Sequence, residues 1–174
     1  MDRNKVVLVD EHDQTIGEMD KLLAHEQGLL HRAFSVFIFN AQGELLLQQR
    51  ADSKYHGGGL WTNTCCSHPQ LDEDIHCAAL ERLEYEMGIR CELRHLYSFV
   101  YNEPVENYLI EHELDHIFIG HSNQTPTPHP LEVQDYKWMR PAAIIIDLLE
   151  HPRRYTVWFR QAFSELVLKS VIKI

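Results

Sequence analysis

Five side chains of this sequence have the chemistry of transition-metal ligands. They are His25, His31, His68, Glu111 and Glu113. The two glutamates alternate along an expected strand, so both carboxylates face one side and His112 faces the other. Imidazole with carboxylate suits Zn, Mn or Fe better than Ca, which prefers oxygen ligands alone. Spacing alone does not assemble them, because they come from three distant segments. The histidines expected to be surface or structural residues are His76, His95, His112, His116, His121, His129 and His151.

Reactive side chains also crowd the stretch 60–88. A short turn carries adjacent cysteines and His68, and residues 75–87 then show the apolar spacing of one amphipathic helix. Asp74 is a suitable N-cap and Gly88 a suitable end. Arg82 and Glu86 lie one turn apart at the edge of the apolar stripe, facing the Cys–His turn, while Glu81, Glu84 and Tyr85 point away. The alternative is an ordinary ion pair on a surface helix.

Composition limits the class of protein. A chain of 174 residues with 44% hydrophobic residues fits one domain, 1–174. The formal charge of −10, without a cluster of Lys and Arg, argues against nucleic acid as a partner and requires any anion to be bound locally. Four cysteines without CxxC spacing indicate free thiols in a reducing compartment. No run approaches about 18 apolar residues, so we expect a cytoplasmic protein without signal peptide or membrane span.

The elements that must position these residues alternate between strand and helix. Strands are predicted at 5–9, 33–39, 44–49, 93–101, 108–119 and 136–139, and helices at 18–25, 75–87, 141–150 and 156–173. Residues 40–43 predict the turn of a hairpin, and 102–107 an acidic turn between two strands. Three prolines make 123–130 a loop. This mixture predicts an α/β or α+β fold.

Several of these segments together resemble one enzyme family. They are His25 with His31, RADSK at 50–54, LWTNTCCSHPQ at 60–70, ERLEYEMG at 81–88 and EHE at 111–113. The pattern is similar to type I isopentenyl-diphosphate isomerase, a branch of the Nudix-fold superfamily, over residues 5–165. The resemblance implies a mixed sheet packed between helices, with an N-terminal strand and helix extension. It also implies interconversion of isopentenyl and dimethylallyl diphosphate, with a small isoprenoid diphosphate as the partner molecule and a monomer or weak homodimer.

The resemblance assigns roles to individual residues. Cys66 and Glu113 match the catalytic pair, Tyr101 the tyrosine beside Glu113, and Trp158 the indole over the hydrocarbon end. The metal-ligand set defined above matches a site for one Mn²⁺ or Zn²⁺. Glu86 matches a ligand of the Mg²⁺ that accompanies the substrate. The cations that match contacts to the diphosphate are Lys21, Arg50, Lys54 and Arg82. Without the resemblance, Trp158 reads equally well as a core residue of a helix.

The hydrolase box of the superfamily, G-x5-E-x7-R-E-U-x-E-E-x-G-U, is altered here. Ser67 stands at its first Gly, Glu73 at its first Glu, and Tyr85 with Glu86 at its Glu-Glu pair. The motif therefore predicts that hydrolysis is lost and the fold kept, and Ser67 leaves the geometry of the turn open. A Nudix hydrolase of a diphosphate and a non-enzymatic metal-binding module are the alternatives.

The implied reaction explains the residue types. Moving the double bond requires a proton added at C4 and another removed from C2, through a tertiary carbocation or something close to it. One acid and one base must serve the substrate, and Glu113 assisted by Tyr101 and the Cys66 thiol suit these tasks, with the donor left open by the sequence. An indole face stabilises such a cation by about 2 kcal/mol when desolvated.

Overall fold

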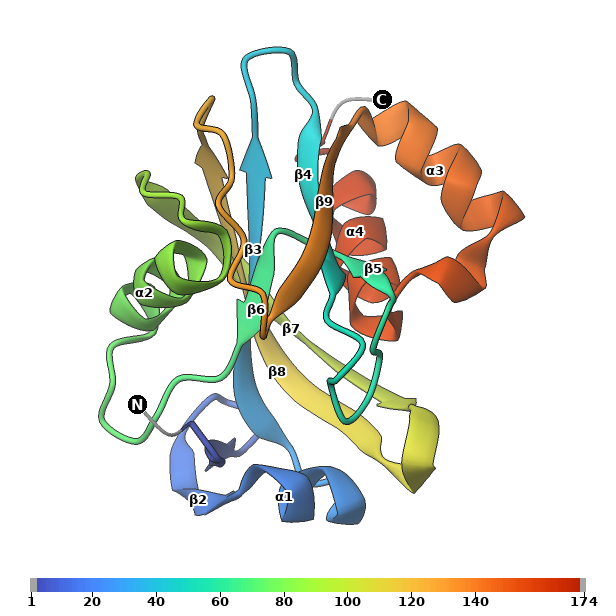
Figure 1. Cartoon of the computed structure of the whole chain (residues 1–174). Coiled ribbons are helices and arrows are strands. Elements are labelled where there is room, and N and C mark those ends of the chain that lie inside the picture. Colours follow the sequence, from blue (N-terminus) through green and yellow to red (C-terminus); the bar gives the residue numbers. More distant parts are fainter. Residues whose placement is uncertain (1–2, 173–174) are drawn as a thin grey trace.

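A twisted mixed sheet with helices on both faces organises the chain, of which the computed structural model describes residues 3–172 (Figure 1). The nine strands are β1 (Lys5–Val9), β2 (Thr15–Asp20), β3 (His31–Phe39), β4 (Leu45–Arg50), β5 (Trp61–Thr62), β6 (Cys65–Ser67), β7 (Leu93–Pro104), β8 (Ile110–His121) and β9 (Val133–Met139). The α-helices of the described residues are α1 (Lys21–Gln27), α2 (Ile75–Met87), α3 (Pro141–Glu150) and α4 (Val157–Leu168). This agrees with the predicted mixture of strands and helices. The extent of a single domain, 1–174, stays a prediction.

Strand β3 is the centre of the sheet. It runs parallel to β8 from His31↔Glu113 to Phe39↔His121 and antiparallel to β6 through three residue pairs that include Ser35↔Cys66. Its run of buried apolar residues is typical of a strand covered on both faces. Because a parallel pair needs a long crossover, β4, β6, α2 and β7 all lie between β3 and β8 in the sequence. The register therefore places the first residue of β3 beside the glutamates of β8.

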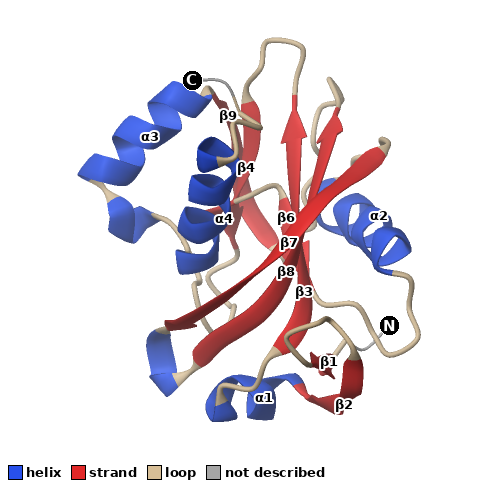
Figure 2. Ribbon diagram, turned by 180° about the vertical axis from the view of Figure 1, so that it is seen from behind, coloured by secondary structure: helices blue, strands red, loops and turns tan. Residues whose placement is uncertain are grey.

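Two apolar cores hold the helices to the sheet. Figure 2 shows α2 on one face and α3 with α4 on the other. Leu83 and Met87 of α2 pack with Cys65 and Phe118 in one core, and Phe159 of α4 belongs to the other. Burying a large apolar side chain contributes about 1.5 to 3 kcal/mol, so these two faces anchor the elements that carry the site. Within residues 3–172, no helix has the length and apolar character that a membrane crossing requires.

Several predicted bounds were wrong. The N-terminal helix, predicted at 18–25, begins only at Lys21, because residues up to Asp20 pair with β1 through Lys5↔Asp20; Asp20 then caps α1. The acidic turn at 102–107 is shorter, since β7 continues to Pro104 opposite Ile110. The strand predicted at 136–139 begins at Val133, and the last helix ends at Leu168. Its predicted end, Lys173, lies outside the described residues. Strands β2, β5 and β6 were not predicted.

Several other local predictions are confirmed, although the strand predicted at 108–119 lies at Ile110–His121. The side chain of Asp74 accepts from the Cys77 amide, and Gly88 ends α2 with a φ of 67°. Segment 40–43 joins the neighbouring antiparallel strands β3 and β4, and 123–130 is a loop. Helix α3 has the predicted bounds. Ser67 lies in β6, paired with Phe34, and has no positive φ, so a serine meets no strain there.

Candidate active site

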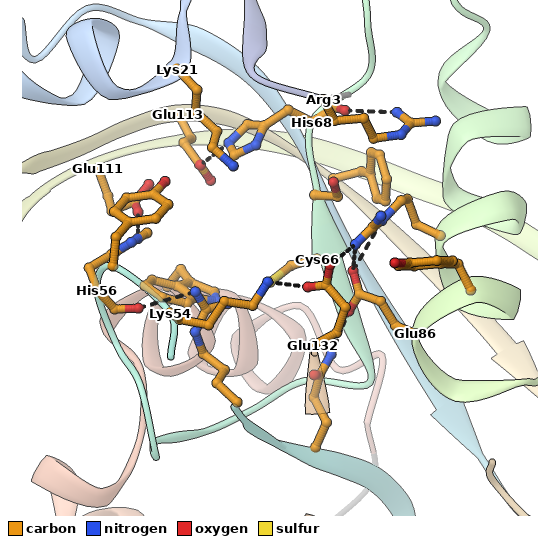
Figure 3. Close-up of a pocket in the computed structure, with 18 of the residues that line it drawn as sticks. Arg3, Lys21, Lys54, His56, Cys66, His68, Glu86, Glu111, Glu113 and Glu132 are labelled. Carbon is orange, nitrogen blue, oxygen red and sulfur yellow. Dashed lines mark hydrogen bonds and ion pairs between the residues drawn. The ribbon is translucent and has the colours of Figure 1, made fainter. Parts of the chain in front are cut away.

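A cavity of about 440 Å³ opens between α1, α2, α4 and one end of the sheet. A volume of this size suits a small molecule. The lining includes every metal-ligand and cation candidate except His25 and His31, which lie buried behind it. Figure 3 shows Glu111 and Glu113 across the pocket from Glu86 and Glu132, with Cys66 between them. Segments that are distant in the sequence thus contribute to one site.

The five predicted metal-ligand residues meet at one wall of this cavity. The ligand atoms of His25, His31, His68 and Glu113 lie within 4.8 Å of one another. The second carboxylate joins them through Glu111 Oε2, which is 3.1 Å from His25 Nε2. As predicted, Glu111 and Glu113 are both buried on one face of β8, while His112 turns away and bonds to the Gly28 carbonyl.

Hydrogen bonds orient two of these imidazoles as ligands. The Nδ1–H of His25 donates to the Lys21 carbonyl at 2.6 Å, and that of His31 donates to the Leu29 carbonyl at 2.8 Å. Each ring therefore presents its Nε2 lone pair to the shared centre, as metal-binding histidines normally do. Among residues 3–172, the buried His31 Nε2 has no hydrogen-bond partner. An orphaned lone pair beside two carboxylates fits a divalent cation.

The protonation states of His68 and Glu113 also favour the binding of a cation. Burial lowers the pKa of His68 to about 4, so its ring is neutral at neutral pH. Burial opposes the ionisation of Glu113, but the neighbouring imidazoles of His31 and His68 outweigh it and hold the Glu113 pKa well below its usual range. His68 Nε2 lies 2.8 Å from Glu113 Oε1. A metal ion bound here would take the place of the proton between these two groups.

The phenol of the predicted chemistry contacts Glu113, and the thiol lines the same cavity. The Tyr101 hydroxyl donates to Glu113 Oε2 at 2.5 Å, across the Tyr101↔Glu113 pair of β7 and β8. Burial raises the Tyr101 pKa well above its usual value. Cys66 lines the cavity, and burial raises its pKa to about 12 against the opposing effect of the Arg50 charge. Thiol and phenol are therefore both neutral at neutral pH beside an ionised carboxylate.

The four predicted cations line the same cavity. Burial lowers the pKa of Lys21, and the charges of Lys54 and Arg50 lower it further. This mutual repulsion is what a bound polyanion would relieve. The buried Arg50 Nε has no hydrogen-bond partner among the described residues, while its guanidinium lies 5.0 Å from the Trp158 ring centroid. Arg82 pairs with Glu86 at 2.6 Å, so the cluster has the charge and the free donors for a diphosphate.

Helix α2 directs Glu86 into this pocket. The carboxylate is buried, with Oε1 on Arg82 and Oε2 accepting from Gln48 Nε2 at 2.9 Å. Arg82 and Glu86 are thus an i,i+4 ion pair that also faces inward, which reconciles the two interpretations of their spacing. The prediction that Glu81 and Tyr85 point away was only partly right, because both reach the rim of the cavity.

The chain is similar to known proteins over most of its length. Residues 29–159 match the NUDIX domain family. An isopentenyl-diphosphate Delta-isomerase 1 of Aromatoleum aromaticum is 48% identical over 164 residues, covering 94% of this chain and 93% of that protein. An isopentenyl-diphosphate Delta-isomerase of Serratia proteamaculans is 47% identical over 161 residues, covering 92% and 90%. This chain belongs to the isopentenyl-diphosphate Delta-isomerases of the NUDIX family.

Solved structures confirm the fold of this isomerase family member. A protein from Deinococcus radiodurans superimposes with a TM-score of 0.69 at 21% identity, over 84% of this chain and 90% of that one. The MutT protein from Methanosarcina mazei gives 0.65 at 17% identity, over 81% and 95%. The predicted Nudix-like mixed sheet is therefore confirmed.

The altered hydrolase box has a visible consequence in this isomerase family member. The Glu81 side chain is 71% exposed and, within the described part of the chain, its one ion pair is with Arg3, while Glu73 is held by Arg3 and the Gln70 amide. Glu86 is the box carboxylate that is buried in the cavity. Hydrolysis by a Nudix enzyme needs a cluster of carboxylates that binds metal ions next to the attacking water. The altered box does not form such a cluster here, which argues against the hydrolase alternative.

The sequence analysis missed several residues of the site, among them Glu132 and His56. Glu132 bonds to Lys54 and lies 3.3 Å from Arg82, so it is the counter-ion of two cations in the cavity. His56 is 7% exposed and bonds to Glu111 Oε1. A usable signal was the glycine run at 57–59, which indicates a loop whose backbone packs closely. No comparable signal pointed to Glu132.

Proposed function

We propose that this chain is an enzyme that interconverts isopentenyl diphosphate and dimethylallyl diphosphate. The observation that carries the proposal is the cavity itself. In it, a neutral thiol, a carboxylate that accepts from the Tyr101 phenol behind it, and a cluster of cations line a space of about 440 Å³. The family membership of the chain supports the same activity. A double-bond shift needs such a pair of proton-transfer groups and a fixed diphosphate.

The proposed proton-transfer groups are Cys66 and Glu113, with Tyr101 donating to Glu113. Before substrate binds, Cys66 carries its proton, because burial raises its pKa to about 12, and Glu113 is ionised. This charge state supplies one donor and one acceptor. Since the reaction is reversible, the two groups exchange roles between the forward and reverse directions. Trp158 presents a buried ring to the same cavity and stabilises positive charge on the hydrocarbon end.

The cationic side of the cavity would bind the diphosphate. Lys21, Arg50, Lys54 and Arg82 neutralise the phosphate oxygens, which lets an acidic protein accept an anionic substrate. Lys54 must exchange its bond to Glu132 for one to the substrate. The orphaned Arg50 Nε gains an acceptor in that complex.

Two metal sites complete the proposal. His25, His31, His68, Glu111 and Glu113 would hold one Mn²⁺ or Zn²⁺, and Glu86 would hold Mg²⁺ together with the diphosphate. These ions supply positive charge: the first favours the ionised form of Glu113, and the second neutralises the phosphates. The protein residues bind, orient and protonate the substrate. We also propose a cytoplasmic location and a monomer or weak homodimer.

A hydrolase is the rival function, and one experiment separates the two. Purified protein is supplied with Mg²⁺ and Mn²⁺ and incubated with isopentenyl diphosphate, and the products are followed by proton NMR and by a phosphate assay. We expect dimethylallyl diphosphate and no released phosphate or pyrophosphate. Phosphate release without isomerisation would refute the proposal in favour of a hydrolase, and metal uptake without turnover would refute it in favour of a binding module.

A further inference from the structure

His56 is a buried histidine to which neither the sequence motifs nor the proposed proton transfer gives a role. It lies in the loop between β4 and β5, and its ring centroid is 4.3 Å from that of Tyr55 and 5.4 Å from that of Trp158. The ring thus fills the space between the metal wall of the cavity and the indole. A polar side chain in such a position needs a polar partner.

That partner is the carboxylate of Glu111. His56 Nε2 bonds to Oε1, while His25 Nε2 lies 3.1 Å from Oε2. His25, His56 and Glu111 also form a buried group whose ligand atoms lie within 4.8 Å of one another. This group and the main ligand cluster describe one metal centre, because the Nδ1 of His25 is engaged by the Lys21 carbonyl and its ring has one lone pair left.

The second ring nitrogen distinguishes His56 from the ligands. The Nδ1–H groups of His25 and His31 donate to backbone carbonyls, which leaves Nε2 as a lone pair. The buried Nδ1 of His56 has no partner among residues 3–172. A buried N–H without an acceptor costs more than a lone pair without a donor, so the proton of a neutral His56 belongs on Nε2, facing Glu111. His56 is therefore arranged as a donor to Glu111.

We propose that His56 is a positioning residue of the metal centre: its Nε2–H holds Glu111 Oε1 and leaves Oε2, beside His25, as the Glu111 oxygen that binds the metal ion. This inference rests on the metal site of the proposed function. Partners of this kind, which orient a ligand without touching the ion, typically change metal affinity about 10- to 100-fold when removed.

The loop that carries His56 is fixed on both sides before any ligand binds. Gly57 has a φ of 60°, and a Cβ there would lie 3.1 Å from the Trp158 ring and 3.3 Å from Arg50 Nε. Arg50 Nη2 donates to the His56 carbonyl at 3.2 Å, and Asn107 Nδ2 donates to the Tyr55 carbonyl at 2.9 Å. The donor to Glu111 is therefore preorganised by residues of the diphosphate side and of the segment that precedes β8.

The test compares His56→Gln with His56→Met. The two side chains have similar length, but only Gln places an N–H where Nε2 of His56 lies. Metal-free full-length protein is titrated with Co²⁺, and the dissociation constant and the visible d–d spectrum are recorded. The same two substitutions at the exposed His121 serve as the control. Thermal unfolding of the metal-free proteins reports any general loss of structure.

We expect His56→Met to weaken Co²⁺ binding about 10- to 100-fold and to alter the d–d spectrum, and His56→Gln to restore most of both. Equal affinity and spectrum in the wild type and His56→Met would overturn the inference, and so would equal losses in both variants, because a direct ligand is not replaced by an amide. If the wild type binds Co²⁺ but the Mn²⁺-loaded enzyme does not isomerise, the proposed function fails, while the two variants still decide the role of His56.

Discussion

Adjacent cysteines of β6 allow a sharp test of the proposed chemistry. Cys65 is fully buried in the core beneath α2, whereas Cys66 lines the cavity. Because successive side chains of a strand point to opposite faces, the two thiols lie in different environments although the residues are adjacent in the sequence. We expect Cys66→Ala to lower the rate of isomerisation and Cys65→Ala to lower the free energy of unfolding.

The magnitudes follow from these environments. General acid–base catalysis contributes about 100- to 10,000-fold, so Cys66→Ala should lower kcat by that factor, or about 3 to 5 kcal/mol of barrier. Its stability should change by less than about 1 kcal/mol, since the lost sulfur borders a cavity. Cys65→Ala leaves a void in a packed core and should cost about 1 to 2 kcal/mol, which lowers Tm by about 2 to 8 °C.

The assay combines turnover in D2O with thermal unfolding. Proton NMR should show that the wild type and Cys65→Ala place solvent deuterium on the carbon that becomes the new methyl group. In the time that the wild type needs to convert its substrate, Cys66→Ala should give no detectable isomer or label, with folding and metal content retained. Cys66→Ser should keep a trace of activity, because a hydroxyl exchanges protons far less readily than a thiol.

The opposite pattern would refute the reasoning. Isomerisation by Cys66→Ala at the wild-type rate would remove Cys66 from the proton transfer, and activity lost in Cys65→Ala at unchanged Tm would transfer the role to its neighbour. A release of phosphate by any of these proteins would contradict the isomerase assignment itself.

The other predictions concern the metal and diphosphate sites. Glu86→Gln should keep the transition metal, which mass spectrometry of the purified protein measures, but raise KM about tenfold or more; purification without that metal would show that the two sites are not separate. Lys54→Met should raise KM about 10- to 100-fold with little change in Tm. Lys137 is the control, because its ammonium lies outside the cavity, 4.1 Å from the Trp61 ring centroid, and Lys137→Met should leave KM unchanged. A lower Tm at normal KM in Lys54→Met would indicate a structural role for Lys54. Burial lowers the pKa of His68 from 6.5 to about 4, so as pH falls the unfolded chain binds a proton on this ring before the folded protein does. The free energy of unfolding of the metal-free protein should therefore decrease as pH falls from 6.5 towards 4. Urea unfolding measures this loss, and an equal pH dependence in His68→Gln would contradict it.

Local signals in the sequence were sufficient for helix α2 and for the shared face of the two glutamates of β8. Helix α2 was predictable because its cap at Asp74, its apolar stripe and its end at Gly88 all act within one segment. The common face of Glu111 and Glu113 follows from the alternation of side chains in a strand. The motifs around Cys66 and Glu86 identified the family, and the resemblance pointed to Cys66, Glu86, Glu113 and the four cations, all of which line the cavity.

Bounds set by pairing with distant strands were not predictable in this way. Residues 18–20 have the composition of a helix start, but hydrogen bonding to β1 makes them a strand. The end of β7 is extended in the same manner by its partner β8. The partner of such a backbone group lies far away in the chain, and the local sequence does not indicate it. Pairing with a distant strand can therefore override the secondary-structure preference of the local sequence.

The contacts that complete the site were decided by tertiary structure alone. The parallel register of β3 and β8 places His31 beside Glu113, and loops bring His56 to Glu111 and Glu132 to Lys54. The sequence contained all of these residue types, and it predicted which of them could bind a metal or a diphosphate. Which imidazole presents a lone pair and which donates a proton depends on the nearest carbonyl or carboxylate in space, and that neighbour exists only once the sheet has formed.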